Sequence, residues 1–131
     1  MKITSVICAI LMFLNSLLHI GLIFGAPLGE YVLGGQYVVF PLKMRLVSVF
    51  FALLLSFMGV IYLKLAGVVH VFISNKLMII FLIINTVLMT YAIFGNLFLT
   101  DSIKETYVMT PFTLVASVCS VIALIKYRMV K

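Results

Sequence analysis

Four long apolar runs, separated by short polar stretches, dominate the pattern of the chain. A helix needs about 20 mostly apolar residues to cross a bilayer. The runs therefore predict membrane spans at about residues 3–25, 46–66, 77–99 and 103–127. Little chain lies outside them, so we expect a single integral membrane domain over residues 1–131. The predicted fold class is all-α, a bundle of four transmembrane helices with up-down-up-down topology.

The first run could also pass for a secretory signal peptide, because Lys2 precedes it. However, residues 3–25 form a stretch of 23 residues, which exceeds the roughly 7–15 apolar residues of a typical signal peptide. Phe24 and Ala26 also make a poor cleavage site. We therefore expect an uncleaved span.

The fourth run offers two helix starts. Ser102 with Glu105 forms an S-x-x-E capping box, whereas Thr110–Pro111 would place proline in the first helical turn. We favour a start near Ser102 with a bend at Pro111, because the run after Pro111 alone is barely long enough to span a bilayer.

Composition agrees with a membrane protein. Hydrophobic residues make up 66% of the chain and charged residues only 9%, whereas a soluble domain carries roughly 25% charged residues. The net charge of +6 could suggest nucleic acid as a partner. The basic residues are instead scattered at the ends of the apolar runs, which favours lipid headgroups and topology control. We expect the lipid bilayer as a partner and no nucleic acid.

The distribution of charge predicts an orientation. Six basic residues fall on the side of the two termini and three on the other side. Cytoplasmic segments carry the excess of Lys and Arg, so we expect both termini in the cytoplasm. The six are Lys2, Lys64, Lys76, Lys126, Arg128 and Lys131, the three are Lys43, Arg45 and Lys104, and the acids Glu30, Asp101 and Glu105 all fall on the outer side.

The first outer connection is long and rich in turn residues. Gly34 and Gly35 separate the β-type runs EYVL and QYVV, as in a hairpin with a type I′ turn. An irregular loop is the alternative, and both interpretations stay open. The residues that we expect to shape this loop are Gly25, Pro27, Gly29, Gly34, Gly35 and Pro41.

Polar residues inside the spans point to one candidate site. Asn15 and His19 lie four residues apart, on one face of the first helix, and an ionisable residue at that depth is a functional-site hypothesis. A Glu30–Arg45 ion pair would close the site from above. The alternative is a neutral structural histidine bonded to an asparagine. The predicted polar pocket, in the outer half of the bundle, comprises His19, Asn15, Glu30, Arg45, Ser48 and Asn96.

The loop also carries a resemblance. The pattern G-A-P-x-G-E at Gly25–Glu30, followed by Gly34–Gly35, Pro41, Arg45 and Ser48, resembles a group of uncharacterised small bacterial four-helix integral membrane proteins. The resemblance implies a multi-pass protein of the bacterial plasma (inner) membrane. It implies no activity.

Three classes of function remain. We expect a non-enzymatic accessory, immunity or stress-related factor that acts through lipid or protein contacts, homodimers included. The alternative is a small transporter or channel, although proton-coupled exporters need a carboxylate within the membrane and we place all three acids outside the spans. An enzyme ranks last, because paired reactive cysteines, clustered metal ligands and a nucleophile with its base are not visible. We predict no catalytic residues, no metal and no cofactor.

Overall fold

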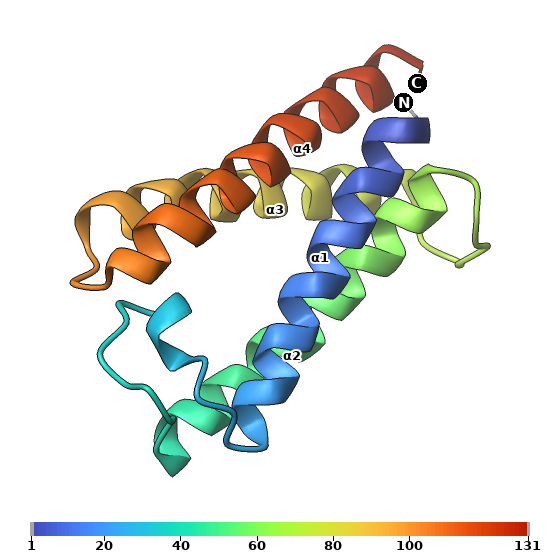
Figure 1. Cartoon of the computed structure of the whole chain (residues 1–131). Coiled ribbons are helices and arrows are strands. Elements are labelled where there is room, and N and C mark those ends of the chain that lie inside the picture. The colour runs from blue at the N-terminus through green and yellow to red at the C-terminus, as the bar shows by residue number, and fades with distance from the viewer. Residues whose placement is uncertain (1, 131) are drawn as a thin grey trace.

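The computed structural model describes residues 2–130, which are helical apart from their connections and hold no β-strand (Figure 1). Four of the helices are long and apolar enough to cross a membrane. A short 3₁₀ turn and a π-helical turn complete the fold. The elements are α1 Lys2–Ile23, η1 Gly29–Tyr31, α2 Leu42–Leu65, α3 Asn75–Phe98, η2 Glu105–Met109 and α4 Thr110–Val130.

The observed helix ends follow capping chemistry more closely than charge. We predicted the second span from residue 46 because Lys43 and Arg45 are charged, but α2 begins at Leu42. Charged side chains do not interrupt a helix. The helix instead begins directly after Pro41, which occupies the N-cap position and cannot lie in the interior of a helix without breaking it. The N-cap of α3 is Ser74, whose side chain accepts a hydrogen bond from the backbone N–H of Leu77.

The fourth helix starts where the capping box predicted. The backbone N–H of Glu105 donates to Ser102 Oγ at 3.3 Å, and helical structure begins at Ile103, directly after Ser102. The π-helical turn η2 lies immediately before Pro111. Because Pro111 has no N–H to donate to the preceding turn, the wider π-helical spacing is tolerated here. The expected disturbance at Pro111 therefore takes the form of a π-bulge.

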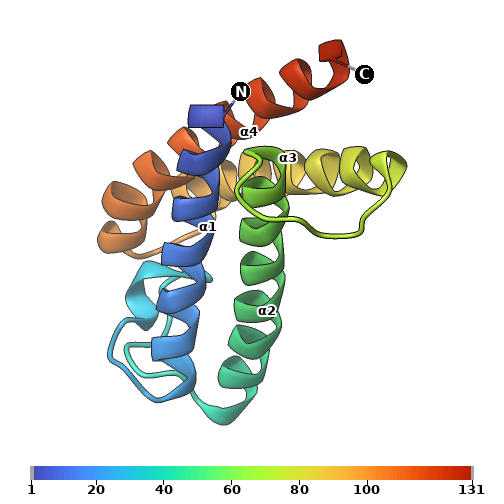
Figure 2. The ribbon, with the colours of Figure 1, turned by 90° about the vertical axis from the view of Figure 1, so that its right-hand side faces the viewer.

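The helices are arranged as two antiparallel pairs (Figures 1 and 2). α1 packs along α2, α3 packs along α4, and α1 also contacts α4. The pairs meet at the end that holds both chain termini, here called the terminal end. From there they diverge towards the opposite end, here called the loop end, where the connection between α1 and α2 lies.

Polar side chains connect the helices within the apolar core. Tyr62 of α2 is hydrogen-bonded to Ser120 of α4 at 2.5 Å and accepts a hydrogen bond from Asn85 of α3 at 2.9 Å. Ser16 of α1 donates to the backbone oxygen of Ala52 in α2 at 2.9 Å. Such bonds join helices in lipid, where apolar surface alone gives no preference for a neighbouring helix.

The α1–α2 connection is an irregular loop, which was one of our two interpretations. The glycine pair has the positive φ values that were predicted, 88° at Gly34 and 66° at Gly35, but Leu33 is also left-handed at 54°. Three consecutive left-handed residues do not form a two-residue hairpin turn. The loop is instead held by burial of Val32 and Phe40 in an apolar cluster with Leu22 of α1 and Met109 of η2.

The loop is fastened to the α3–α4 connection. Glu30 forms an ion pair with Lys104 at 2.6 Å, and the backbone oxygen of Glu30 accepts a hydrogen bond from Ser102 Oγ at 2.6 Å. The hydrogen bond with Glu30 raises the pKa of Lys104 above its ordinary value. The predicted Glu30–Arg45 pair was wrong, because Glu30 pairs with Lys104, just before η2, while Arg45 Nε donates to the backbone oxygen of Phe40.

Glycine is required at position 29 by a close backbone approach. A Cβ atom there would lie 2.1 Å from the backbone oxygen of Tyr37 and 2.8 Å from the Phe40 ring. We expect Gly29→Ala to reduce the free energy of unfolding by about 1–3 kcal/mol, the range for an overpacked site. The readout is thermal unfolding followed with a thiol-reactive dye, since Cys8 and Cys119 are both free and buried.

Gly95→Ala is the matched control. A Cβ atom at Gly95 would meet nothing within 4 Å, and alanine is favoured over glycine in a helix by roughly 0.5–1 kcal/mol. The control should unfold at the original temperature or above it. Equal unfolding temperatures for both variants would contradict the described loop.

The Glu30–Lys104 pair predicts a charge-swap result. Glu30→Lys places two cations side by side and should speed hydrogen exchange of the loop, including the Gly34 amide. The double variant Glu30→Lys/Lys104→Glu restores the attraction and should slow the exchange again. Both differences should shrink at high salt, because exposed ion pairs are screened.

Asp101→Lys makes the same change of charge on an exposed acid for which no ion pair is found in residues 2–130. It should leave the exchange of the loop near its original rate. A double variant that exchanges as fast as Glu30→Lys would refute the pairing.

Candidate functional site

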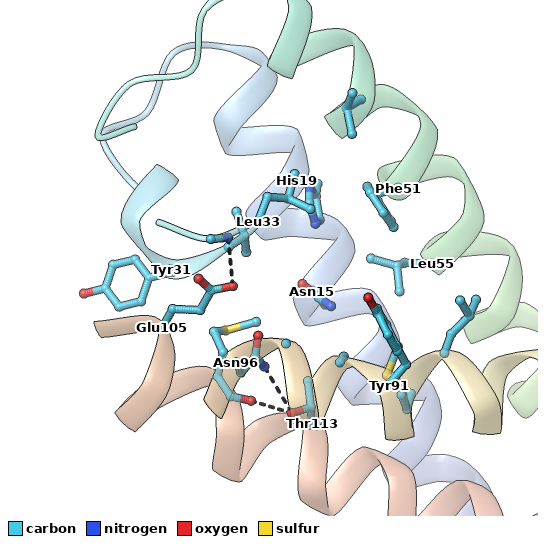
Figure 3. A pocket seen from close by; sticks show the side chains of 18 of the residues that line it. Asn15, His19, Tyr31, Leu33, Phe51, Leu55, Tyr91, Asn96, Glu105 and Thr113 are labelled. Atoms are coloured by element: carbon cyan, nitrogen blue, oxygen red, sulfur yellow. Dashed lines mark hydrogen bonds between the residues drawn. The ribbon is translucent and has the colours of Figure 1, made fainter. Parts of the chain in front are cut away.

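A cavity of about 660 Å³ lies between the two helix pairs in the loop-end half of the molecule (Figure 3). This volume falls in the range of roughly 300–1,000 Å³ that is typical of small-ligand sites. All four long helices contribute to its wall, and the loop covers it through Tyr31, Leu33 and neighbouring residues. The divergence of the pairs creates the space, and the loop encloses it.

Three of the six predicted pocket residues line this cavity: Asn15, His19 and Asn96. Ser48 is not part of the lining; it is buried and hydrogen-bonded to His19. Glu30 and Arg45 are not part of the lining, since each side chain is engaged in the loop contacts described above. The predicted residues on α1 and α3 therefore line one cavity, whereas Glu30 and Arg45 do not cover it as predicted.

His19 is held in a fixed orientation. Its ring is 4% exposed, Nδ1 lies 3.2 Å from Ser48 Oγ, and the ring stacks on Phe51 with a centroid distance of 5.2 Å. Ser48 and Phe51 both belong to α2, so the histidine also joins α1 to α2.

Two asparagines, Asn15 and Asn96, line the cavity. Asn96 Nδ2 donates to Thr113 Oγ1 at 3.3 Å, which leaves the Asn96 side-chain oxygen on the cavity side (Figure 3). Asn15 Oδ1 is buried and has no hydrogen-bond partner among the described residues. An unpaired buried acceptor costs about 1–3 kcal/mol. This part of the wall therefore lacks a hydrogen-bond donor.

Glu105 is the lining residue that sequence reasoning missed. The side chain is 3% exposed, Oε1 accepts the Gly34 N–H at 3.4 Å, and Oε2 accepts a hydrogen bond from Thr100 Oγ1. We had placed this acid outside the spans, which was wrong, because the fourth candidate span begins with it. The spacing in the sequence could have indicated this position. Glu105 precedes Thr113 by eight residues and Ala116 by eleven, which places it on the same face of the helix as these two residues.

The cavity is polar on one side and open on the other. Glu105, Asn96 and Asn15 lie on the side of α1, α4 and the loop, whereas Phe51, Leu55 and Tyr91 lie opposite (Figure 3). The exposed lining residues include Val47 of α2, at 39%, and Leu88 and Tyr91 of α3, at 38% and 64%. α2 and α3 share few close contacts. The cavity therefore opens sideways between α2 and α3, through an apolar mouth.

The lining combines hydrogen-bonding side chains with apolar ones. Within residues 2–130, no group of three His, Cys, Asp or Glu side chains could hold a metal ion. The wall offers a carboxylate and amide oxygens at one side and a broad apolar surface at the other. These features suit an amphipathic molecule with a donor-bearing head.

Comparisons with known proteins give no assignment for the chain. No family model, no curated protein and no solved structure matches it. The functional argument therefore rests on the geometry of the cavity.

Proposed function

We propose that the chain is a non-enzymatic polytopic membrane protein that binds a single amphipathic, lipid-like molecule in the cavity between its helix pairs. The observation that carries the proposal is the sideways opening between α2 and α3 into a space of about 660 Å³. A mouth between two helices of spanning length faces hydrocarbon. A ligand that partitions into the bilayer can therefore enter without crossing water.

The proposal includes an orientation in the bacterial plasma membrane. The helices cross in up-down-up-down order, with the terminal end in the cytoplasm and the loop outside. The positive-inside rule supports this orientation, because Lys2, Lys64, Lys76, Lys126 and Arg128 lie towards the terminal end. The basic residues towards the loop end are Lys43, Arg45 and Lys104.

The polar wall lies at a depth that suits an amphiphile. Glu105 begins the fourth candidate span, so it would lie close to the outer interface, where lipid headgroups reside. The apolar mouth on α2 and α3 extends from there towards the membrane centre. A head near Glu105 and a tail between α2 and α3 would match the surroundings of each part.

The loop gives the bound molecule a route to a partner. Tyr31 and Leu33 line the cavity, and the same loop presents Tyr37 and Val38 as exposed residues. A ligand in the cavity would contact the underside of a surface that faces outwards. An accessory, immunity or stress-related factor that acts through lipid and protein contacts could use this arrangement, as a monomer or as a homodimer.

Transport is the second candidate, and one observation favours it. Glu105 is a buried carboxylate in the cavity wall, which is the kind of group that proton-coupled exporters require. Solute flux into liposomes that contain the purified protein separates transport from binding. Acid–base catalysis ranks below both candidates.

The orientation is tested with single cysteines at exposed positions. Val38→Cys in the loop should react with a membrane-impermeant maleimide on intact cells. His70→Cys, in the connection between α2 and α3, should react only after the membrane is permeabilised. The native Cys8 and Cys119 are buried and should give little background. The reverse pattern would show the opposite orientation.

The binding proposal is tested by filling the cavity. Ala92 lines it from α3, so Ala92→Phe should abolish cross-linking of a photoactivatable dodecyl amphiphile to α2 and α3, mapped by mass spectrometry in nanodiscs. Val87→Phe adds similar bulk on an exposed position of the same helix outside the cavity lining, and cross-linking should persist. Cross-links that are spread evenly over lipid-facing residues, and equal in both variants, would refute the proposal.

A further inference from the structure

We propose that the cavity selects a positively charged amine: its ligand is a single-tailed amphiphile whose protonated primary amine sits against the Glu105 carboxylate and the amide oxygens of Asn15 and Asn96. This inference rests on the proposed binding function and names the chemical class of the ligand. The charge of the wall, the engagement of Lys104 elsewhere and the unpaired acceptor of Asn15 support it independently.

The charge of the cavity wall is opposite to that of the chain. The chain carries nine Lys and Arg residues and a net charge of +6. None of the nine belongs to the residues that line the cavity, whereas one of the three acids, Glu105, does. A cationic head would therefore meet attraction from Glu105 and no nearby repulsion from a lysine or arginine of the wall.

Among residues 2–130, no cation forms an ion pair with Glu105. An ionised carboxylate buried away from water is costly unless a cation pairs with it. Lys104, the adjacent residue in sequence, forms its ion pair with Glu30 at 2.6 Å. The hydrogen bonds that Glu105 accepts come from neutral groups, the Gly34 N–H and the Thr100 hydroxyl. A bound ammonium group would supply the missing positive charge.

The hydrogen-bonding groups point to a head with N–H donors. Asn15 Oδ1 is buried without a partner among the described residues, and the Asn96 amide nitrogen is already used by Thr113. Asn96 therefore offers an acceptor on the cavity side, and Asn15, a lining residue, holds an unpaired acceptor beneath the cavity surface. A primary ammonium has three donors, which can serve Glu105 and both amides. A quaternary ammonium has none and would leave Asn15 unpaired.

The same wall disfavours a phosphate. Phosphate groups are bound by arginine, lysine and backbone N–H groups, and lysine and arginine are missing from the lining residues. An ethanolamine phospholipid would carry its phosphate into this acidic surrounding. A simple alkylamine has no such group, and its tail can leave between Phe51, Leu55 and Tyr91 towards the apolar mouth.

The test uses the full chain in nanodiscs of phosphatidylcholine, which contains no primary amine. The probe is dodecylamine with a photoactivatable diazirine near the end of its tail. Cross-links should map to α2 and α3, and unlabelled dodecylamine should compete for them. Dodecyltrimethylammonium and lyso-phosphatidylethanolamine should compete about tenfold more weakly or worse, and dodecanoate should not compete. Competitor concentrations are corrected for partition into empty nanodiscs.

Substitutions assign the selectivity to residues. Glu105→Gln keeps the size and one acceptor oxygen, and should weaken competition by dodecylamine about 30-fold or more, as for loss of one partner of a buried charge pair. Asp101→Asn removes the same charge from an exposed acid outside the cavity lining and should change nothing. Asn15→Leu should remove the preference for the primary over the quaternary amine.

The outcomes separate this inference from the proposed function. Equal competition by dodecylamine and dodecanoate on the unaltered chain overturns the amine assignment, even where Glu105→Gln fails to fold. Cross-links that stay within the cavity and vanish in Ala92→Phe would then still support a binding site of different selectivity. Stronger competition by lyso-phosphatidylethanolamine than by dodecylamine would replace the simple amine with a phospholipid. Cross-links outside the cavity remove both proposals.

Discussion

The structure depends on polar contacts between helices at the point where the two pairs meet. Lipid tails are as apolar as leucine, so burial of apolar side chains gives one helix little preference for another over lipid. Tyr62, Ser120 and Asn85 bring α2, α4 and α3 to one hydrogen-bonded cluster. Each of these groups would be costly in hydrocarbon without a partner. The cluster therefore determines where the α1–α2 pair is attached to the α3–α4 pair.

Tyr62 lies near the terminal end of α2, so this attachment leaves the loop-end halves of the two pairs free to diverge. α2 and α3 share few close contacts, and the loop-end halves of the pairs are connected through the loop. The loop places Val32 and Phe40 in an apolar cluster and pairs Glu30 with Lys104. This second attachment covers the cavity with loop residues and engages Lys104, so that Glu105 lies in the cavity wall without a cationic partner among residues 2–130.

Much of this arrangement could be predicted from particular residues. The apolar runs predicted four helices of spanning length, which the structure has. Ser102 predicted the start of the fourth helix and Ser74 is the N-cap of α3. Asn15, His19 and Asn96 were predicted to share a pocket, and all three line the cavity. The ion pair of Glu30 could not be derived, because it depends on the path of an irregular loop. The path results from burial of Val32 and Phe40 and from the contact of Gly29 with the Tyr37 backbone, which are tertiary effects that no local pattern encodes. Glu105 was misplaced because a carboxylate was taken to lie outside any span.

The chain places an acid, Glu105, in the cavity wall where a neutral side chain would serve the structure. Its side-chain contacts are a hydroxyl and one long bond from the Gly34 amide, 3.4 Å between nitrogen and oxygen. A glutamine could accept the Gly34 bond through its oxygen and donate from its amide nitrogen to Thr100 Oγ1, without an ionisable group in a buried position. Asn15 poses the same problem on the same side of the cavity, because its buried oxygen has no partner among the described residues, whereas a leucine would leave no polar atom unpaired there. One ligand with a cationic, donor-bearing head resolves both costs at once. A purely structural role resolves neither.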